Sequence, residues 1–448
     1  MSGLPDLPTL AQMTFAYGML GKTFRGGASG YQQRGAAHLC GPDPETTYQG
    51  PRQGAAKTEN VALYGACGIA NGSGVIMGMP AQHQASVITR ARIMEFLREF
   101  QRFGWVRPSG QSGFFNATWN TGGFLRVVSA HQAEMQDRRK TSQPGHTGQI
   151  LILDEGQNLF DEDVRELLPS VAIAYLEGKS KVIIPGVGGP PASIIEAKKT
   201  MGYASFWIDD RIVMAEEPQF APFFAQMERE NTTEFYEANY KCLPITAGAR
   251  LLYPDLPSLI PPPYYAGPSI NVYGIDVGRT RDYTVIAHLR HWPAWGASHV
   301  LGFKQIPHGN LEDQARWCFE WIEAGGALPP EVTGQDRYWD DTQIGCETNG
   351  IGTGLSDPLQ RRYFPRLQKV NVDEKRIHKA VQSLRVKFKQ GAYSVSDEAR
   401  SLRTGVPPQR LDALTFKIDE KGKYKYPHSD ANAALIVAEV VAQRVETE

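Results

Sequence analysis

The chain has 448 residues, of which 41% are hydrophobic and 21% are charged, and its formal net charge at pH 7 is −1. This length exceeds one ordinary core and predicts two domains of about 200 residues each, while the composition excludes a largely disordered chain. No apolar run approaches the ~20 residues that a bilayer span needs, and five scattered cysteines without C-x-x-C spacing argue against a disulfide framework or a zinc site.

In the first half of the chain, apolar runs of strand type alternate with segments of helical period. This alternation predicts a mainly parallel sheet with helical crossovers, as in α/β domains. The predicted strands are 75–79, 124–129, 150–153 and 181–185, and the predicted helices are 86–103 and 164–176.

A candidate phosphate-binding loop precedes the first of these strands. Such a loop needs a Lys that reaches the β- and γ-phosphates and a hydroxyl that binds Mg²⁺, which predicts these roles for Lys57 and Thr58. Pro51 and Ala56 stand where the usual motif has glycine, and we expect Ala56 to fit if its φ is negative. An ordinary basic turn before a helix is the alternative. The predicted ATP-binding residues of the loop are Arg52, Gln53, Gly54, Ala55, Ala56, Lys57 and Thr58.

The segment Ile150–Glu155, with the sequence ILILDE, is an apolar strand that ends in two carboxylates. In ATPases with a phosphate loop, this arrangement delivers one acid to Mg²⁺ and the next to the attacking water. The pattern therefore predicts that Asp154 binds the metal and that Glu155 is the catalytic base. Strands also end in acids by chance, so the prediction depends on the phosphate loop upstream.

Other segments of this half have weaker signals. The small residues of Gly186–Ser193, which follow a strand, could couple hydrolysis to movement, with a plain Gly/Pro loop as the alternative. An arginine from a neighbouring subunit would stabilise the transferred phosphoryl group, with Arg126, Arg138 and Arg139 as candidates. Tyr31–Gln33 is a candidate for recognition of the base.

A proline-rich segment at 251–270, with six prolines, separates the two halves. Prolines at this density exclude an interior strand or helix, so we predict a linker between domains at 1–250 and 271–448. Predicted strands then follow at 271–277, 283–291, 299–305 and 342–347, with a helix at 311–324, two more helices, and a last helix from about Ser429.

Three acids in the second half lie far apart in the sequence but near the ends of predicted elements. Asp276 lies on the first strand, Glu347 ends a later strand, and Asp430 lies in the first turn of the last helix. Two-metal cleavage of phosphodiesters needs carboxylates that converge on two cations, so we predict these three as catalytic and metal-binding residues. Asp282 is a fourth candidate metal ligand or a turn residue. Helix capping is the alternative for Asp430.

The stretch 361–410 has 13 Lys and Arg against 4 Asp and Glu, a local net charge of +9. Basic side chains beside a nuclease site would position the phosphate backbone of DNA without reading its sequence. A solvated helix face is the alternative. The candidate DNA-binding residues are Lys375, Arg376, Lys379, Arg385 and Lys387.

Several motifs in this order resemble those of large subunits of tailed-bacteriophage terminases. They are Arg52-Gln53 with Lys57-Thr58, then VIMGMPAQHQA, ILILDEGQNL, PGVGG, GIDVG, CETNGIG and HSDANAALIVAEV. The resemblance implies a P-loop NTPase domain followed by an RNase H-like nuclease domain. It also implies ATP and Mg²⁺ as cofactors, with Mn²⁺ as an alternative in the nuclease site.

The same resemblance implies a motor that moves viral double-stranded DNA into procapsids and an endonuclease that cuts concatemeric DNA. Expected partners are the portal protein, the procapsid, the small terminase subunit and further copies in a ring, with no membrane. The expected location is the host cytoplasm, with transient docking at the portal and absence from the mature virion. Two alternatives are an RNase H-like resolvase with a non-hydrolysing nucleotide domain and a non-catalytic DNA-docking assembly protein.

Overall fold

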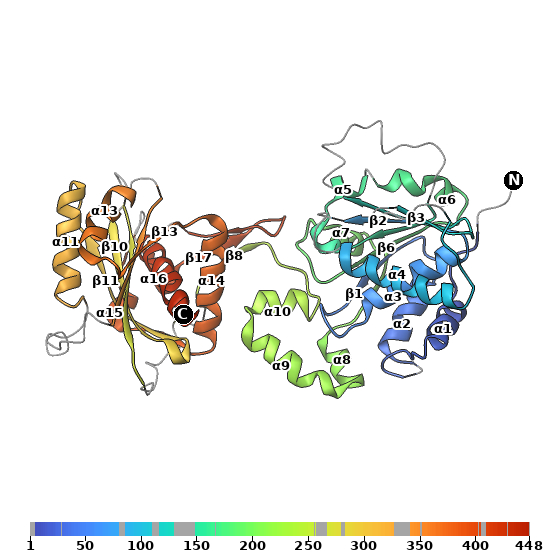
Figure 1. Ribbon diagram of the computed structural model, residues 1–448, viewed down its shortest axis with the longest axis horizontal. Helices are drawn as coiled ribbons and strands as arrows, with labels where there is room; N and C mark the ends of the chain where they lie inside the picture. Colours follow the sequence, from blue (N-terminus) through green and yellow to red (C-terminus); the bar gives the residue numbers. More distant parts are fainter. Residues whose placement is uncertain are drawn as a thin grey trace. The chain divides into compact units, whose positions relative to one another are not determined.

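The chain divides into two compact units in the computed structural model (Figure 1). The first unit contains Met1–Glu228, Thr233–Ala247 and Glu420–Lys423, and the second contains Arg229–Thr232, Gly248–Asp419 and Tyr424–Glu448. The structure describes residues 5–27, 29–79, 86–109, 116–129, 148–165, 167–254, 256, 267–278, 283–326, 341–349, 352–401, 403–404, 409–427 and 429–447.

The first unit is built on a sheet with the strand order β3-β4-β2-β5-β6-β1-β7. All neighbouring strands are parallel except β3 and β4. The predicted strands of this half are confirmed. The strands are β1 (Glu45–Gln49), β2 (Gly74–Met79), β3 (Asn116–Thr118), β4 (Phe124–Ser129), β5 (Ile150–Leu153), β6 (Lys181–Gly186) and β7 (Ala204–Trp207).

Helices cover both faces of this sheet (Figure 1), so its central strands are apolar on both sides. Ile150 and Ile152 lie in a core with the helices of one face, and Leu151 and Leu153 lie in a second core on the other face. The first core includes residues of α1 (Leu10–Met19), α2 (Tyr31–Leu39), α3 (Lys57–Ala70) and α4 (Ser86–Arg102), and the second includes residues of α7 (Ile194–Thr200).

The single helix predicted at 164–176 is wrong. The segment contains the end of α5 (Asp161–Arg165), a 3-10 turn η3 (Leu168–Val171) and a short helix α6 (Ala172–Leu176). Pro169 lies at the start of the 3-10 turn, and its ring nitrogen cannot donate the hydrogen bond that a continuous helix would need.

A third core of the first unit lies beside the phosphate loop. It packs Tyr31 and Ala55 against Phe224, Tyr236 and Tyr240. The last three come from a helical segment that contains α8 (Asp210–Glu216), α9 (Ala221–Glu230) and α10 (Thr233–Asn239).

The sheet of the second unit has the strand order β13-β12-β9-β10-β11-β14. Strands β9, β10 and β11 form an antiparallel meander, and β12 and β13 add to it in parallel with β9. The predicted strands of this half are confirmed. The strands are β9 (Ile270–Asp276), β10 (Thr284–Trp292), β11 (Ala297–Ile306), β12 (Thr342–Glu347), β13 (Leu367–Val370) and β14 (Tyr393–Val395).

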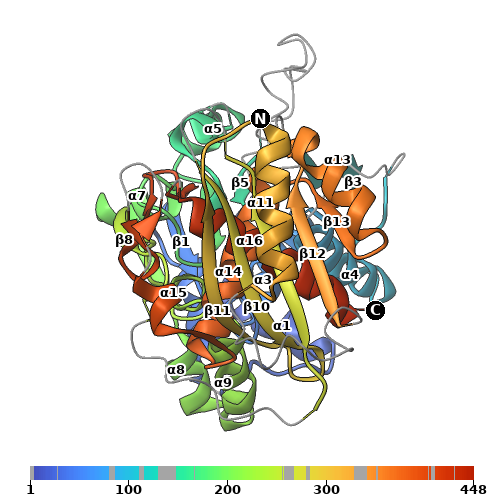
Figure 2. The same ribbon diagram turned by 90° about the vertical axis from the view of Figure 1, so that its left-hand side faces the viewer.

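Helices also cover both faces of this second sheet (Figure 2). Tyr273 and Ile275 of β9 pack against α11 (Leu311–Glu323) and α13 (Gly352–Tyr363). Between them, Gly274 faces the opposite way, where a Cβ would come within 2.4 Å of backbone atoms of α16 (Asp430–Thr447). The absence of a side chain at Gly274 therefore lets this last helix lie directly against the sheet. The helix α14 (Glu374–Lys389) packs beside α16.

A small antiparallel sheet joins β17 (Thr415–Ile418) to β8 (Gly248–Leu251) on one side and to β18 (Tyr424–Lys425) on the other. Short elements near it are α15 (Asp397–Ser401), β15 (Arg403–Thr404) and β16 (Gln409–Arg410). Residues 255 and 257–266 of the predicted linker lie outside the described residues, so the linker remains a prediction. Within the described part of the chain, no helix is both long and apolar enough to cross a membrane.

Candidate nucleotide and nuclease sites

The candidate phosphate loop connects the end of β1 to the start of α3. Because β6 lies between β1 and β5, the carboxyl ends of the three parallel strands meet at one edge of the sheet. The loop, the small residues after β6 and the acids after β5 therefore gather at this edge, which is where open α/β sheets bind ligands.

The backbone of the loop turns through two left-handed residues, Gly54 at φ 92° and Ala56 at φ 51°. The condition under which Ala56 was expected to fit, a negative φ, is therefore not met, and the left-handed conformation costs an L-residue about 1–2 kcal/mol. No side chain caps the first turn of α3, which starts at Lys57. Its free N–H groups suit an anion such as a phosphate.

Hydrogen bonds to other parts of the first unit hold the loop in place. The backbone N–H of Arg52 donates to the carbonyl of Asn239 at 2.7 Å, and the Tyr31 hydroxyl donates to the carbonyl of Gly54 at 2.8 Å. Of the candidates for base recognition, Tyr31 and Gln32 are fully buried, which argues against that role for their side chains in this conformation, whereas Gln33 is half-buried and its role remains a prediction. Tyr31 supports the phosphate loop instead.

Lys57 and the two acids after β5 lie close enough to perturb one another. Burial lowers the pKa of Lys57, and the nearby carboxylates of Glu155 and Asp154 oppose that change. Burial also raises the pKa of Asp154 to about 6, although a hydrogen bond from Thr89 and the positive charge of Lys57 both lower it. The structure thus brings together the predicted phosphate-binding lysine and both predicted acids. The Lys57 Nζ donates to the carbonyl of Pro51 at 3.3 Å.

Glu155 adopts a left-handed backbone, with φ 56° and ψ 47°, and begins the 3-10 turn η2 (Gly156–Asn158). Its carboxylate accepts a hydrogen bond from the side-chain amide of Gln157. Sequence reasoning missed both Gln157 and Thr89, although the DEGQN sequence has an amide two residues after the acid. Strained backbone of this kind is concentrated at functional sites.

The loop after β6 is hydrogen-bonded to the end of β1. The Gly50 N–H donates to the Gly186 carbonyl at 3.2 Å, and the Gln49 side chain donates to the Val187 carbonyl at 3.1 Å. Gln49 also donates to Glu196 of α7 at 2.9 Å. The segment Gly186–Ser193, predicted to couple hydrolysis to movement, thus contacts the phosphate loop through a set of buried polar groups.

The remaining predicted residues of this site differ in exposure. Arg52 and Gln53 are exposed, and Thr58 is half-buried in the first turn of α3. Arg126 lies half-buried in β4. Arg138 and Arg139 lie outside the described residues, so the identity of a trans-acting arginine remains a prediction.

In the second unit, the three predicted acids lie at one edge of the sheet. Cys346 of β12 pairs with Ile275 of β9, so the next residues, Glu347 and Asp276, end adjacent parallel strands. Asp430 is the first residue of α16.

The direction of α16 brings Asp430 to the same edge. The far end of the helix, at Glu446, lies 3.6 Å from the Nε2 of His291, and His291 pairs with Ile270 at the start of β9. The helix therefore runs antiparallel to β9, and its first turn lies towards the end of that strand, where Asp276 is.

Asp276 and Asp430 are buried, with 8% and 1% of their surface exposed. Asp276, Glu347 and Asp430 all lie in the described part of the chain, yet no group of three His, Cys, Asp or Glu side chains that could hold a metal ion occurs there. The predicted convergence of the three acids on shared cations is therefore not seen in this conformation, and Asp282 lies outside the described residues. The chemistry of the donors still fits a hard divalent cation, because Mg²⁺ and Mn²⁺ prefer carboxylate oxygens.

The candidate DNA-binding residues of α14 fall into two groups. Lys375, Arg376 and Lys379 are exposed near the start of the helix. Arg385 is buried, with its guanidinium 4.9 Å from the centre of the Phe416 ring. The DNA-binding prediction is therefore wrong for Arg385 in this conformation, because its side chain packs inside the unit.

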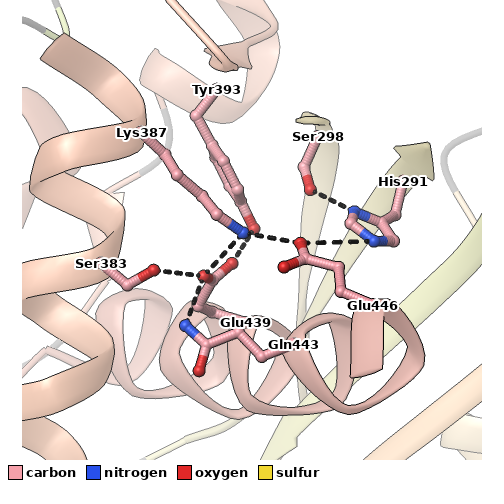
Figure 3. Close-up of polar contacts among 8 residues, drawn as sticks. All are labelled: His291, Ser298, Ser383, Lys387, Tyr393, Glu439, Gln443 and Glu446. Carbon is pink, nitrogen blue, oxygen red and sulfur yellow. Dashed lines mark hydrogen bonds and ion pairs between the residues drawn. The ribbon is translucent and has the colours of Figure 1, made fainter. Parts of the chain in front are cut away.

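The same correction applies to Lys387 (Figure 3). Its Nζ forms ion pairs with Glu439 at 3.1 Å and Glu446 at 2.8 Å, and only 14% of its side chain is exposed. Tyr393 donates to the same Glu439 carboxylate at 2.8 Å. Lys387 therefore pairs with the buried Glu439 and the more exposed Glu446 of α16. The other polar partners in this network are Ser383, Gln443, His291 and Ser298.

Comparison with known proteins identifies the fold. No protein-family model matches the chain, and no curated protein matches it. Among solved structures, it is similar to the large terminase from the thermophilic bacteriophage D6E in two crystal forms. These match with TM-scores of 0.51 and 0.50 and 10% sequence identity, over 90% of this chain and 94% of the other. The predicted α/β fold class, with a mainly parallel sheet and flanking helices in the first unit and a mixed sheet with helices in the second, is confirmed, and so is the resemblance to large terminases at the level of fold.

Proposed function

We propose that this chain is the large subunit of a tailed-phage terminase, which moves viral double-stranded DNA into procapsids with ATP and cuts the concatemer. The observation that carries the proposal is the combination of two candidate sites, each at the carboxyl edge of its own sheet, in a chain with the fold of a large terminase. A resolvase or an assembly protein would not need both sites to be active.

In the first unit, ATP phosphates would bind the uncapped start of α3, with Lys57 on the β- and γ-oxygens. Thr58 and Asp154 would hold Mg²⁺, which would neutralise charge on the transferred phosphoryl group. Glu155 would orient and deprotonate the attacking water. An arginine from a neighbouring copy in the ring would complete the site, with Arg126 as one candidate.

In the second unit, Asp276, Glu347 and Asp430 would hold two divalent cations, with Asp282 as a further ligand. Bound there, the cations would activate a water and stabilise the leaving oxygen of the DNA backbone. The exposed cations Lys375, Arg376 and Lys379 would contact phosphates and hold the duplex without reading its sequence. Recognition would depend on the small terminase subunit and the portal, where the chain would dock in the host cytoplasm.

The test measures two activities of the purified full-length chain. We expect DNA-stimulated phosphate release from ATP, and plasmid nicking that requires Mg²⁺ or Mn²⁺. Glu155→Gln should abolish the first activity alone, and Asp276→Asn the second alone. Asp397→Asn, at a fully exposed acid of the second unit, is the matched control.

Each alternative has its own outcome. Nicking without any phosphate release would favour a resolvase with a non-hydrolysing nucleotide domain. DNA binding with neither activity would favour a docking protein and would contradict the proposal.

A further inference from the structure

We infer that Gln157 is a positioning residue that links the catalytic base Glu155 to the glycine-rich loop after β6. The inference rests on the proposed ATPase function and adds a residue to it. Gln157 lies in the 3-10 turn after the DE pair, between β5 and the end of β6.

The two ends of the Gln157 amide have different partners. The Nε2 donates to the Glu155 carboxylate, and the Oε1 accepts the backbone N–H of Val187 at 3.2 Å. Only one orientation of the amide satisfies both contacts, because a carboxylate can only accept and a backbone N–H can only donate. The side chain therefore holds one oxygen of the base and leaves the other for water.

The glycines after β6 leave room for this side chain. A Cβ at Gly186 would lie 2.5 Å from the Gln157 Oε1, and a Cβ at Gly189 would lie 2.9 Å from the Gln157 Cβ. Real Cβ atoms do not approach so closely. Gln157 is thus one reason for glycine at 186 and 189, together with the Ser193 Oγ, which would lie 2.5 Å from a Cβ at Gly189.

Val187 also connects the amide to the phosphate loop. Its N–H binds Gln157, and its carbonyl accepts a hydrogen bond from Gln49 at the end of β1. The preceding carbonyl, of Gly186, accepts the N–H of Gly50. A displacement of the phosphate loop on binding or releasing nucleotide would therefore move the Val187 peptide, and Gln157 would pass that movement to the Glu155 carboxylate.

The first test compares Gln157→Ala with Asn158→Ala, an exposed neighbour in the same 3-10 turn. We expect Gln157→Ala to lower kcat for ATP by about tenfold to a hundredfold, since a displaced catalytic group costs rates of that order. The KM for ATP and the melting temperature should change little. Asn158→Ala should match the wild type.

A second measurement needs neither nucleotide nor metal. Hydrogen exchange at the Val187 amide should be faster in Gln157→Ala than in the wild type, because the acceptor for its N–H is gone. The Gly50 amide, whose acceptor is the Gly186 carbonyl, should keep its protection. Unchanged exchange at Val187 would overturn the inference.

Gln157→Glu separates the two contacts of the side chain. It keeps an oxygen that can accept the Val187 N–H, but a carboxylate has no N–H to donate to Glu155. The kcat of this variant should therefore fall as in Gln157→Ala, whereas a purely structural role would leave it near that of the wild type.

Each result separates the inference from the proposed function. If the wild type and Asn158→Ala hydrolyse ATP, Glu155→Gln does not, and Gln157→Ala equals the wild type, the inference fails and the function stands. The inference also fails if Gln157→Ala loses nucleotide binding or unfolds while Gln157→Glu keeps the kcat of the wild type. An inactive wild type would overturn both.

Discussion

In the first unit, the candidate site depends on left-handed backbone at two residues that are not glycine, Ala56 and Glu155. In the second unit, the acids depend on glycines in the sheet, which let a helix lie close enough to bring Asp430 to the edge of β9. The first site therefore stores backbone strain next to groups that would move during the proposed cycle of hydrolysis, whereas the second is fixed by close packing and, in the proposed function, would only hold ions. Substitutions should affect the two sites in different ways.

The largest effect is expected from the acids of the second unit. Asp276→Asn or Asp430→Asn should lower the rate of metal-dependent plasmid nicking on the order of a thousandfold, because metal ions supply several kcal/mol of transition-state stabilisation. Phosphate release from ATP should not change. Asn also caps helices well, so a residue that only caps α16 would tolerate Asp430→Asn with nicking intact.

Close packing in the second unit is tested by Gly274→Ala. The added methyl group would meet the Ala434 carbonyl oxygen at 2.2 Å and the Ala438 nitrogen at 2.4 Å. Backbone cannot rotate away, so we expect a loss of about 3 kcal/mol in stability and loss of nicking, with ATP hydrolysis retained. Gly345→Ala should cost less, because its methyl group would meet valine side chains at 2.6 Å and 2.9 Å. Calorimetry would compare the losses of stability of the two variants, and the two activity assays would show which function each variant keeps. Equal losses of stability would contradict the prediction.

The buried carboxylate of the first unit should make stability depend on pH. Burial raises the pKa of Asp154 from 3.8 in the unfolded chain to about 6 in the folded one. The stabilisation that the protonated Asp154 gives the folded state is therefore fully present below pH 4 and is lost as the pH rises through 6. Without Mg²⁺ and ATP, Asp154→Asn should therefore be more stable than the wild type at pH 7, by about 3 kcal/mol. The difference should disappear near pH 4. Asp6→Asn, at an exposed acid, should show no such trend in denaturant unfolding.

The smallest effect is expected from the strained alanine of the phosphate loop. Ala56→Gly should stabilise the first unit by about 1 kcal/mol, because glycine adopts the left-handed conformation without a steric cost. Ala55→Gly, one residue earlier at a buried position with ordinary backbone, should instead destabilise it. In thermal unfolding, the transition that shifts when a non-hydrolysable ATP analogue is added belongs to the first unit, and its midpoint would be compared between variants. A lower midpoint in Ala56→Gly would show that Ala56 is not strained.

Much of the fold could be predicted because both sheets contain apolar strands with clear turns between them. The strand β1 could not, since its sequence is Glu45-Thr46-Thr47-Tyr48-Gln49 and lacks an apolar pattern. Its polar groups are buried with distant partners, as when the Thr47 hydroxyl donates to Ser205 at 2.8 Å. Such partners are set by tertiary structure and leave no local signal.

The candidate sites show the same limit. Asp154, Asp276 and Glu347 could be predicted because each lies at the end of a recognisable strand. The inward direction of Lys387 could not be predicted, because it depends on Glu439 and Glu446 of α16, which lie far away in the sequence. Gln157 was missed for a similar reason, because one of its two partners, Val187, lies in the loop after β6, far from Gln157 in the sequence.

The position of Asp430 at the start of α16 has a consequence for synthesis of the protein. A ribosome makes β9 and β12 well before this helix, so a nascent chain can contain Asp276 and Glu347 while Asp430 is still untranslated. Until α16 emerges and packs on Gly274, the proposed nuclease site lacks one of its acids. If the site cuts DNA as proposed, unfinished chains would be unable to damage the DNA around them, and cutting would begin only in chains whose sheet has received its last helix.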